Sequence, residues 1–140
     1  MLKHSFTLTV RYAETDAQGV VHHANYLVWF EEGRSEFLRR FGMNYSDFER
    51  AGFFAVVAHA EVDYRAPAFF EERITVTTTL AKARSRVMEF TYRAVNQDDT
   101  LVAEGRTVHV FIGRDRRPTS LPGEWLAQFR EDRHDADFPG

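Results

Sequence analysis

The chain has 140 residues, of which 44% are hydrophobic and 28% are charged, with a net charge of −3 and no cysteine. This composition fits one compact domain with a sizeable core and excludes a disordered chain. It also argues against a nucleic-acid or anionic-membrane partner, disulfides, thiolate nucleophiles and cysteine metal sites. Because no apolar run has the length of a signal peptide or a membrane span, we expect a cytoplasmic protein without membrane insertion.

The first two predicted elements are a strand and a helix. Residues 4–11 alternate polar and apolar side chains, which is typical of a half-buried strand. Over residues 24–41 apolar side chains recur at helical spacing, and others lie around the rest of the circumference. Such a helix is expected to be enclosed by the rest of the fold. Gly33 inside it costs about 1 kcal/mol relative to alanine and favours a close approach to a sheet.

The remaining elements are a short helix, four strands and a terminal helix. Ser46 and Glu49 have the spacing of a capping box, for a helix that ends at Gly52. Four segments rich in β-branched and aromatic residues are separated by turn residues, which predicts an antiparallel meander. These segments are 53–65, 73–81, 86–96 and 101–112, and a short helix is expected at 124–130. We expect one domain, residues 1–131, and a polar tail, 132–140.

The most informative segment is YAETDAQGVVHHANY, residues 12–26, between the predicted strand and the predicted helix. It places Asp16 in a polar turn, and Gly19 permits a positive φ that brings His22 and His23 back toward the acid. Backbone N–H groups at a helix start are unpaired and lie at the positive end of the helix dipole. A carboxylate beside them predicts a site that hydrolyses a carbonyl compound.

Each residue of this segment also has a structural interpretation. Asp16 can cap a turn, His23 can satisfy local hydrogen bonds, and Tyr12 can pack with its hydroxyl in water. The motif as a whole favours catalysis for Asp16. Asn25 is typical of a helix cap, and His22 is typical of a structural or pocket-lining residue.

The motif at residues 12–38 and the segment VDYRAPA at 62–68 resemble the hotdog-fold acyl-CoA thioesterases of the 4-hydroxybenzoyl-CoA thioesterase type. The similarity spans residues 5–121 and is strongest to the short acyl-CoA branch encoded beside bacterial Tol–Pal genes. It implies an α+β hotdog fold, in which a sheet of about five antiparallel strands wraps around one long central helix. It also implies hydrolysis of an acyl-CoA thioester without a cofactor, in a homodimer or homotetramer. The apolar run at residues 53–57 is consistent with such an interface.

The resemblance also implies roles for individual residues. Asp16 matches the essential acid of the family, which acts as general base or nucleophile, and Tyr12 and His23 match the residues that accompany it. The thioester carbonyl would accept a hydrogen bond from the backbone N–H of His23. Further substrate contacts are expected from the same segment, at Gly19, Val20, His22 and Asn25.

The phosphates of coenzyme A require cations. The resemblance favours the cluster at the start of one predicted strand, formed by Lys82, Arg84, Ser85 and Arg86. A solvated strand edge that prevents aggregation is the structural interpretation of the same residues. Arg114, Arg116 and Arg117 form a second basic cluster.

Functions from other classes are less consistent with the sequence. Asp16, His22, His23, His59 and His109 lack the usual spacing of metal ligands, so we expect no metal. The segment GRSEF at 33–37 lacks the second glycine of a nucleophile elbow. A hotdog protein that binds acyl groups without hydrolysing them, or a dehydratase of that fold, stays open.

Overall fold

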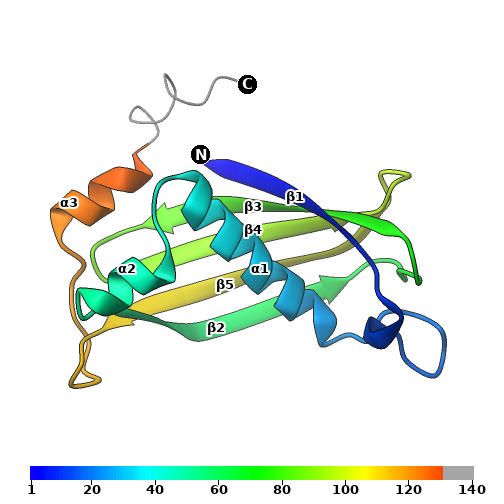
Figure 1. Ribbon diagram of the computed structural model, residues 1–140, viewed down its shortest axis with the longest axis horizontal. Helices are drawn as coiled ribbons and strands as arrows, with labels where there is room; N and C mark the ends of the chain where they lie inside the picture. Colours follow the sequence, from blue (N-terminus) through cyan, green and yellow to red (C-terminus); the bar gives the residue numbers. More distant parts are fainter. Residues whose placement is uncertain (131–140) are drawn as a thin grey trace.

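The computed structural model describes residues 1–130 and has an α+β architecture, with one five-stranded antiparallel sheet and three helices in this range (Figure 1). The predicted tail at 132–140 lies outside the described residues. No helix within residues 1–130 is long and apolar enough to cross a membrane. The strands are β1 (Lys3–Thr9), β2 (Phe54–Tyr64), β3 (Arg73–Ala83), β4 (Val87–Val95) and β5 (Leu101–Ile112). The helices are α1 (Asn25–Arg40), α2 (Tyr45–Arg50) and α3 (Gly123–Leu126), with 3-10 turns η1 (Tyr12–Glu14) and η2 (Ala127–Phe129).

The strand order of the sheet is β1-β3-β4-β5-β2. The predicted meander is therefore correct for β3, β4 and β5 and wrong for β2, which pairs with β5 in a register that sets Phe54 opposite Ile112. Strand β1, and not β2 as the meander would require, is the second neighbour of β3. Residues 65–72 carry the chain from β2, at one edge of the sheet, to β3, which lies beside the edge strand β1. The Val10 N–H donates to Glu72 O and the Glu71 N–H donates to Val10 O, which ties this connection to the residue that follows β1.

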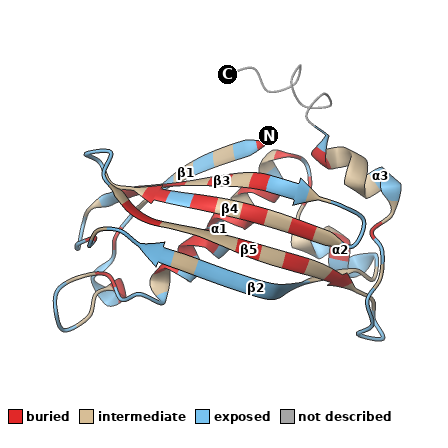
Figure 2. Ribbon diagram, turned by 180° about the vertical axis from the view of Figure 1, so that it is seen from behind, coloured by how far each residue is buried: buried red, intermediate tan, exposed pale blue. Residues whose placement is uncertain are grey.

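Helix α1 packs closely against one face of the sheet. Its Phe30 ring stacks on Tyr92 of β4 with ring centroids 4.5 Å apart. A Cβ atom added to Gly33 would lie 2.6 Å from Oγ1 of Thr78, so the predicted close approach at this glycine is confirmed. Figure 2 shows buried positions recurring along β3, β4 and β5, whereas β2 is exposed over most of its length.

The cap of α2 differs from the prediction. The N-cap is Asn44, whose side chain accepts a hydrogen bond from the Asp47 backbone N–H at 3.0 Å, and Ser46 lies inside the helix. Asn44 is as good a cap as serine, and the capping-box pattern does not distinguish between the two starting points. Gly52 follows the helix with φ +94°, as expected for the residue that ends it.

A polar network crosses the core between α1 and the sheet. The buried Arg34 guanidinium donates to the hydroxyls of Tyr92 and Tyr45, both at 3.2 Å. The Tyr92 hydroxyl is hydrogen-bonded to Thr107, which is bonded in turn to Nε2 of His109 at 2.8 Å. Burial, aided by the charge of Arg34, lowers the pKa of His109 to about 4. This core therefore keeps His109 neutral.

We predict that Gly33→Ala lowers the free energy of unfolding by about 1–2 kcal/mol, because overpacking against the stiff, buried Thr78 outweighs the helix propensity of alanine. Urea unfolding with an unchanged m-value measures the loss. Thr78→Ala in the same chain removes the clashing oxygen and should make the alanine at position 33 less costly than in the wild-type background. A stabilised single variant would disprove the close contact.

The pKa of His109 predicts a pH dependence of stability. Between the ordinary pKa of 6.5 and the folded value of about 4, the unfolded chain binds a proton that the folded chain does not. The free energy of unfolding therefore decreases as the pH is lowered through this range, by about 2 kcal/mol from pH 7.5 to pH 5. His109→Gln removes this contribution, so urea unfolding near pH 7.5 and near pH 5 should show a smaller loss for the variant. Equal losses in both chains would contradict the prediction.

Candidate active site

Asp16 lies in a tight loop between η1 and α1. The loop is closed by hydrogen bonds from the Asp16 N–H to Val20 O and from the Gly19 N–H to Asp16 O, both at 2.9 Å. Gly19 has φ +85°, the conformation for which glycine was predicted here. Oδ1 of the half-buried Asp16 accepts the Gln18 N–H at 2.8 Å, and its other oxygen has no hydrogen bond within residues 1–130. That second oxygen is available to a ligand.

The backbone amide of His23, two residues before α1, lies between amides that have acceptors. The N–H of His22 donates to Glu14 O, that of Ala24 to Nδ1 of His22, and that of Asn25 to His22 O. The N–H of His23 has no acceptor in the part of the chain that the structure describes. An unpaired N–H at the positive end of a 16-residue helix is suited to a carbonyl oxygen or an anion.

A pocket of about 400 Å³ brings the acid and this residue together. Three predicted site residues line it, namely Asp16, Val20 and His23. Its other walls come from the loop, from α1 and from the end of β2 and the residues after it: Val21, Tyr26, Tyr64, Arg65, Ala66 and Pro67. The Tyr64 hydroxyl donates to His23 O at 3.1 Å, which ties the end of β2 to the start of α1.

The other residues predicted from the motif lie close to this pocket without lining it. The ring of Tyr12, 75% exposed, packs edge-on against Phe70, and its hydroxyl makes no hydrogen bond to Asp16. His22 stacks on His23 with ring centroids 4.2 Å apart. The N-cap position is occupied by Ala24, so the prediction of a capping Asn25 is wrong. The Asn25 side chain donates instead to Glu14 O at 2.9 Å.

Sequence reasoning missed Glu14, Tyr64 and Arg65. Glu14 is 5% exposed, and its carboxylate accepts hydrogen bonds from the Arg11 N–H and from the Trp29 indole, both at 2.8 Å. Arg65 is held in ion pairs by Glu104 and Asp63. The sequence does carry signals for them, namely a glutamate two residues before Asp16 and the segment VDYRAPA, which includes residues 64 and 65. The contacts of Tyr64 with His23 and of Arg65 with Glu104 depend on the tertiary structure.

The predicted coenzyme A cluster lies at the other end of the sheet. Lys82, Arg84, Ser85 and Arg86 form the β3–β4 hairpin, while the start of β3 lies beside the end of β1 that leads to Asp16 (Figure 1). The 11 residues of β3 span roughly 35 Å, so the structure does not bring the cluster and the acid together within one chain.

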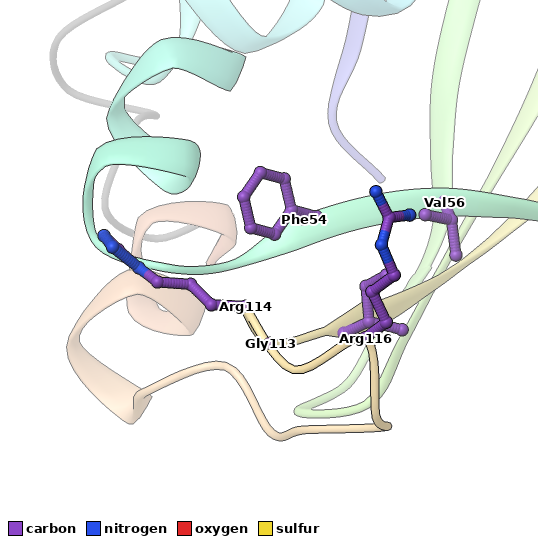
Figure 3. A pocket seen from close by; sticks show the side chains of 6 residues that line it. Phe54, Val56, Gly113, Arg114 and Arg116 are labelled. Atoms are coloured by element: carbon purple, nitrogen blue, oxygen red, sulfur yellow. The ribbon is translucent and has the colours of Figure 1, made fainter.

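A second pocket, of about 350 Å³, lies where β5 ends and β2 begins (Figure 3). Phe54, Val56, Ile112 and Gly113 line it together with Arg114 and Arg116 of the second basic cluster. One of these arginines is engaged, because Nη2 of Arg114 donates to Arg50 O at 2.9 Å. The pocket lies at the opposite end of β2 from Tyr64. Within residues 1–130, no group of three or more His, Asp or Glu side chains could hold a metal ion.

Comparisons with known proteins agree with this fold. Residues 10–129 match the model of the thioesterase-like superfamily. The chain is 34% identical to the acyl-CoA thioester hydrolase YbgC of Escherichia coli O6:H1, over 87% of this chain and 92% of that protein. It is 31% identical to a 1,4-dihydroxy-2-naphthoyl-CoA hydrolase of Rippkaea orientalis, over 89% and 92% of the two chains.

The similarity extends to solved structures. A DHNA-CoA thioesterase from Staphylococcus aureus superposes with a TM-score of 0.89 at 28% identity, over 98% of this chain and 95% of that one. The match to the family model covers the acid loop, every helix and the sheet from β2 to β5. The chain therefore belongs to the thioesterase-like superfamily and has its hotdog-like fold.

Proposed function

We propose that the protein is an acyl-CoA thioesterase that hydrolyses its substrate to a free acid and coenzyme A. The observation that carries the proposal is that Asp16 and His23 line the same pocket, while the His23 N–H has no acceptor within residues 1–130. Two relatives are named for hydrolysis of coenzyme A thioesters, which favours this substrate class. The narrower assignment to the branch beside Tol–Pal genes, and a cytoplasmic location, rest on the sequence alone and stay predictions.

In the proposed reaction the His23 N–H and the Asp16 carboxylate have different roles. The thioester oxygen accepts a hydrogen bond from the His23 N–H, which stabilises the oxyanion that forms during attack by roughly 3 kcal/mol, by analogy with other oxyanion donors. Asp16 either takes a proton from the attacking water or attacks the carbon itself through its unengaged oxygen. In the first route water adds to the thioester carbon, the carbon–sulfur bond breaks, and the proton that Asp16 took from the water passes to the thiolate of coenzyme A. In the second route the carbon–sulfur bond breaks as a mixed anhydride forms on Asp16, and a water then hydrolyses this anhydride, which releases the free acid and restores the carboxylate, while the thiolate takes up a proton. Both routes are compatible with the geometry.

We also propose roles for the His23 side chain, for Tyr12 and for the basic cluster at residues 82–86. The side chain of His23 lines the pocket and can contact the substrate or relay a proton. A direct hydrogen bond from Tyr12 to Asp16 would require movement of an exposed ring. The cluster at Lys82, Arg84, Ser85 and Arg86 can reach substrate phosphates at an Asp16 site only if another protomer supplies it. Lys82 is 3.9 Å from Glu89, which already offers it a counter-charge.

We also propose that the sheet wraps around α1 as the central helix of a hotdog fold. The stacking of Phe30 on Tyr92 and the contact of Phe37 with Phe90 support this arrangement. Strand β2 forms one edge of the sheet and, within residues 1–130, pairs only with β5; its Val56 and Val57 are 37% and 54% exposed. The first half of β2, residues 54–58, is apolar and uncharged, and the charged residues Glu61 and Asp63 lie in its second half. An apolar edge segment without proline or lysine favours pairing with a second copy, and hence a homodimer or homotetramer.

We predict that Asp16→Asn lowers the turnover of acyl-CoA by at least about a hundredfold, because it removes the base or nucleophile. The asparagine oxygen can still accept the Gln18 N–H, so the loop should keep its conformation. Release of free thiol, measured across aromatic, short and long acyl-CoAs and an acyl carrier protein thioester, tests the activity. His23→Ala is the matched control, because it keeps the backbone N–H and should lose less.

Two outcomes of this assay would overturn the proposal. Near wild-type turnover of Asp16→Asn would remove the acid from the mechanism. Tight binding of acyl-CoA by the wild type, without thiol release from any substrate, would favour the acyl-binding or dehydratase alternatives.

The open edge predicts the effect of a charge on association. Wild type should sediment as a dimer or larger assembly at micromolar concentration, and Val57→Lys should shift it toward monomer, because a lysine is disfavoured between paired edge strands. Val28→Lys changes a valine of equal exposure, 54%, on α1 and should leave pairing through β2 intact. A stable wild-type monomer would contradict the proposed interface.

A further inference from the structure

Glu14 is a buried carboxylate whose two oxygens serve two different parts of the chain. Oε1 accepts the Arg11 N–H at the end of the first strand, and Oε2 accepts the indole N–H of Trp29 in α1. The nearest cation is the Nε of Arg11, 3.7 Å away on a side chain that is 75% exposed. Burying a charge with so little compensation is costly. The bond from the Arg11 N–H belongs to the capping box of η1, whereas the bond from the Trp29 indole joins this turn to α1 and has no such local role.

The backbone of Glu14 strengthens the same connection. Its carbonyl oxygen accepts the His22 N–H at 2.8 Å and the Asn25 side-chain amide at 2.9 Å. Together with the Trp29 contact, residue 14 thus makes three hydrogen bonds to the start of α1. Asp16 follows two residues later in the sequence, and the unpaired amide of His23 is adjacent to His22.

The carboxylate is chemically suited to this place. Both of its partners are N–H donors, and an ionised carboxylate only accepts hydrogen bonds, so it satisfies both donors at once. Glutamine has the same shape but would present an NH₂ group to one of the two donors. Trp29 is 1% exposed, so its indole N–H has no access to water as an alternative partner.

We propose that Glu14 is a positioning residue, which sets the separation between the Asp16 carboxylate and the His23 N–H. This inference rests on the proposed thioesterase function and names a further residue on which its rate depends. Glu14 does not line the pocket, so its effect is transmitted through the acid loop and the first turn of α1. Misplacement of reacting groups by about 1 Å can cost a hundredfold in rate.

The test is steady-state hydrolysis of acyl-CoA by Glu14→Gln. We expect kcat to fall by about tenfold or more while KM stays within about twofold, because the substrate contacts remain and their alignment is lost. Glu72→Gln is the matched control. Its carboxylate also accepts one backbone N–H, from Phe69, and one side-chain N–H, from Gln97. This variant should lose stability without losing kcat.

A second variant approaches the same contact from the helix. Trp29→Phe removes the indole donor and should show the same selective loss of kcat. This variant tests the proposal by itself if Glu14→Gln does not fold. In the double variant the glutamine can accept from Arg11 without an opposing indole N–H, so its kcat should exceed the product of the two single effects. Strictly multiplicative effects would overturn the proposal, as would a wild-type kcat in Glu14→Gln.

An amide spectrum gives a readout that does not depend on activity. The ¹H–¹⁵N signals of His23 and Asp16 should move in Glu14→Gln and stay in place in Glu72→Gln. If wild type hydrolyses no acyl-CoA, the proposed function fails whatever these signals do. If wild type is active, Asp16→Asn is inactive and Glu14→Gln is normal, then only the positioning role fails.

Discussion

The structure depends on how closely α1 approaches the sheet. Two glycines make this approach possible: a Cβ on Gly33 would collide with Thr78, and a Cβ on Gly105 would lie 2.7 Å from the ring of Phe30. The ring of Phe30, which stacks on Tyr92, occupies the space that a side chain at position 105 would need. Because these contacts fix the helix along its length, they also fix where its first turn meets the acid loop. The candidate site is thus a consequence of core packing.

The same interface holds a polar network that a purely apolar core would lack. Arg34 has hydroxyl partners, and through Tyr92 and Thr107 the network reaches His109. Burying an arginine without a carboxylate partner is costly, and each hydroxyl in the network has to keep its partner for the charge to be tolerated. The close approach of α1 therefore requires specific polar contacts as well as small residues, which restricts the helix to one position on the sheet.

At the end of this interface, the chain forms a pocket from segments that are distant in sequence. The loop contributes a carboxylate and His23, just before α1, contributes a backbone amide; within residues 1–130 one carboxylate oxygen and this amide make no hydrogen bond. Tyr64 joins β2 to the same site through its hydroxyl bond to His23. Since β2 is also the open edge of the sheet, association with a second copy would act on a strand that already forms one wall of the pocket.

Local sequence determined those features whose causes are local. The glycine at position 19 predicted the positive φ that folds the loop, and the apolar spacing predicted helix at residues 24–41, where α1 runs from Asn25 to Arg40. Gly33 predicted the close approach to the sheet, and the motif at residues 12–26 predicted one site for Asp16 and His23, which both line the same pocket. In each case a few neighbouring residues carry the information.

Tertiary structure decided the rest. Three features depend on contacts between remote segments of the chain. These are the position of β2 at the edge beside β5, the hydrogen bond between Glu14 and Trp29, and the distance of residues 82–86 from Asp16. Alternating side chains predict a strand but not its neighbour, because every strand offers the same backbone donors and acceptors. The bond between Glu14 and Trp29 likewise follows from no local pattern, since the two residues become adjacent only when the helix docks, whereas the bond of Glu14 to the Arg11 N–H is local.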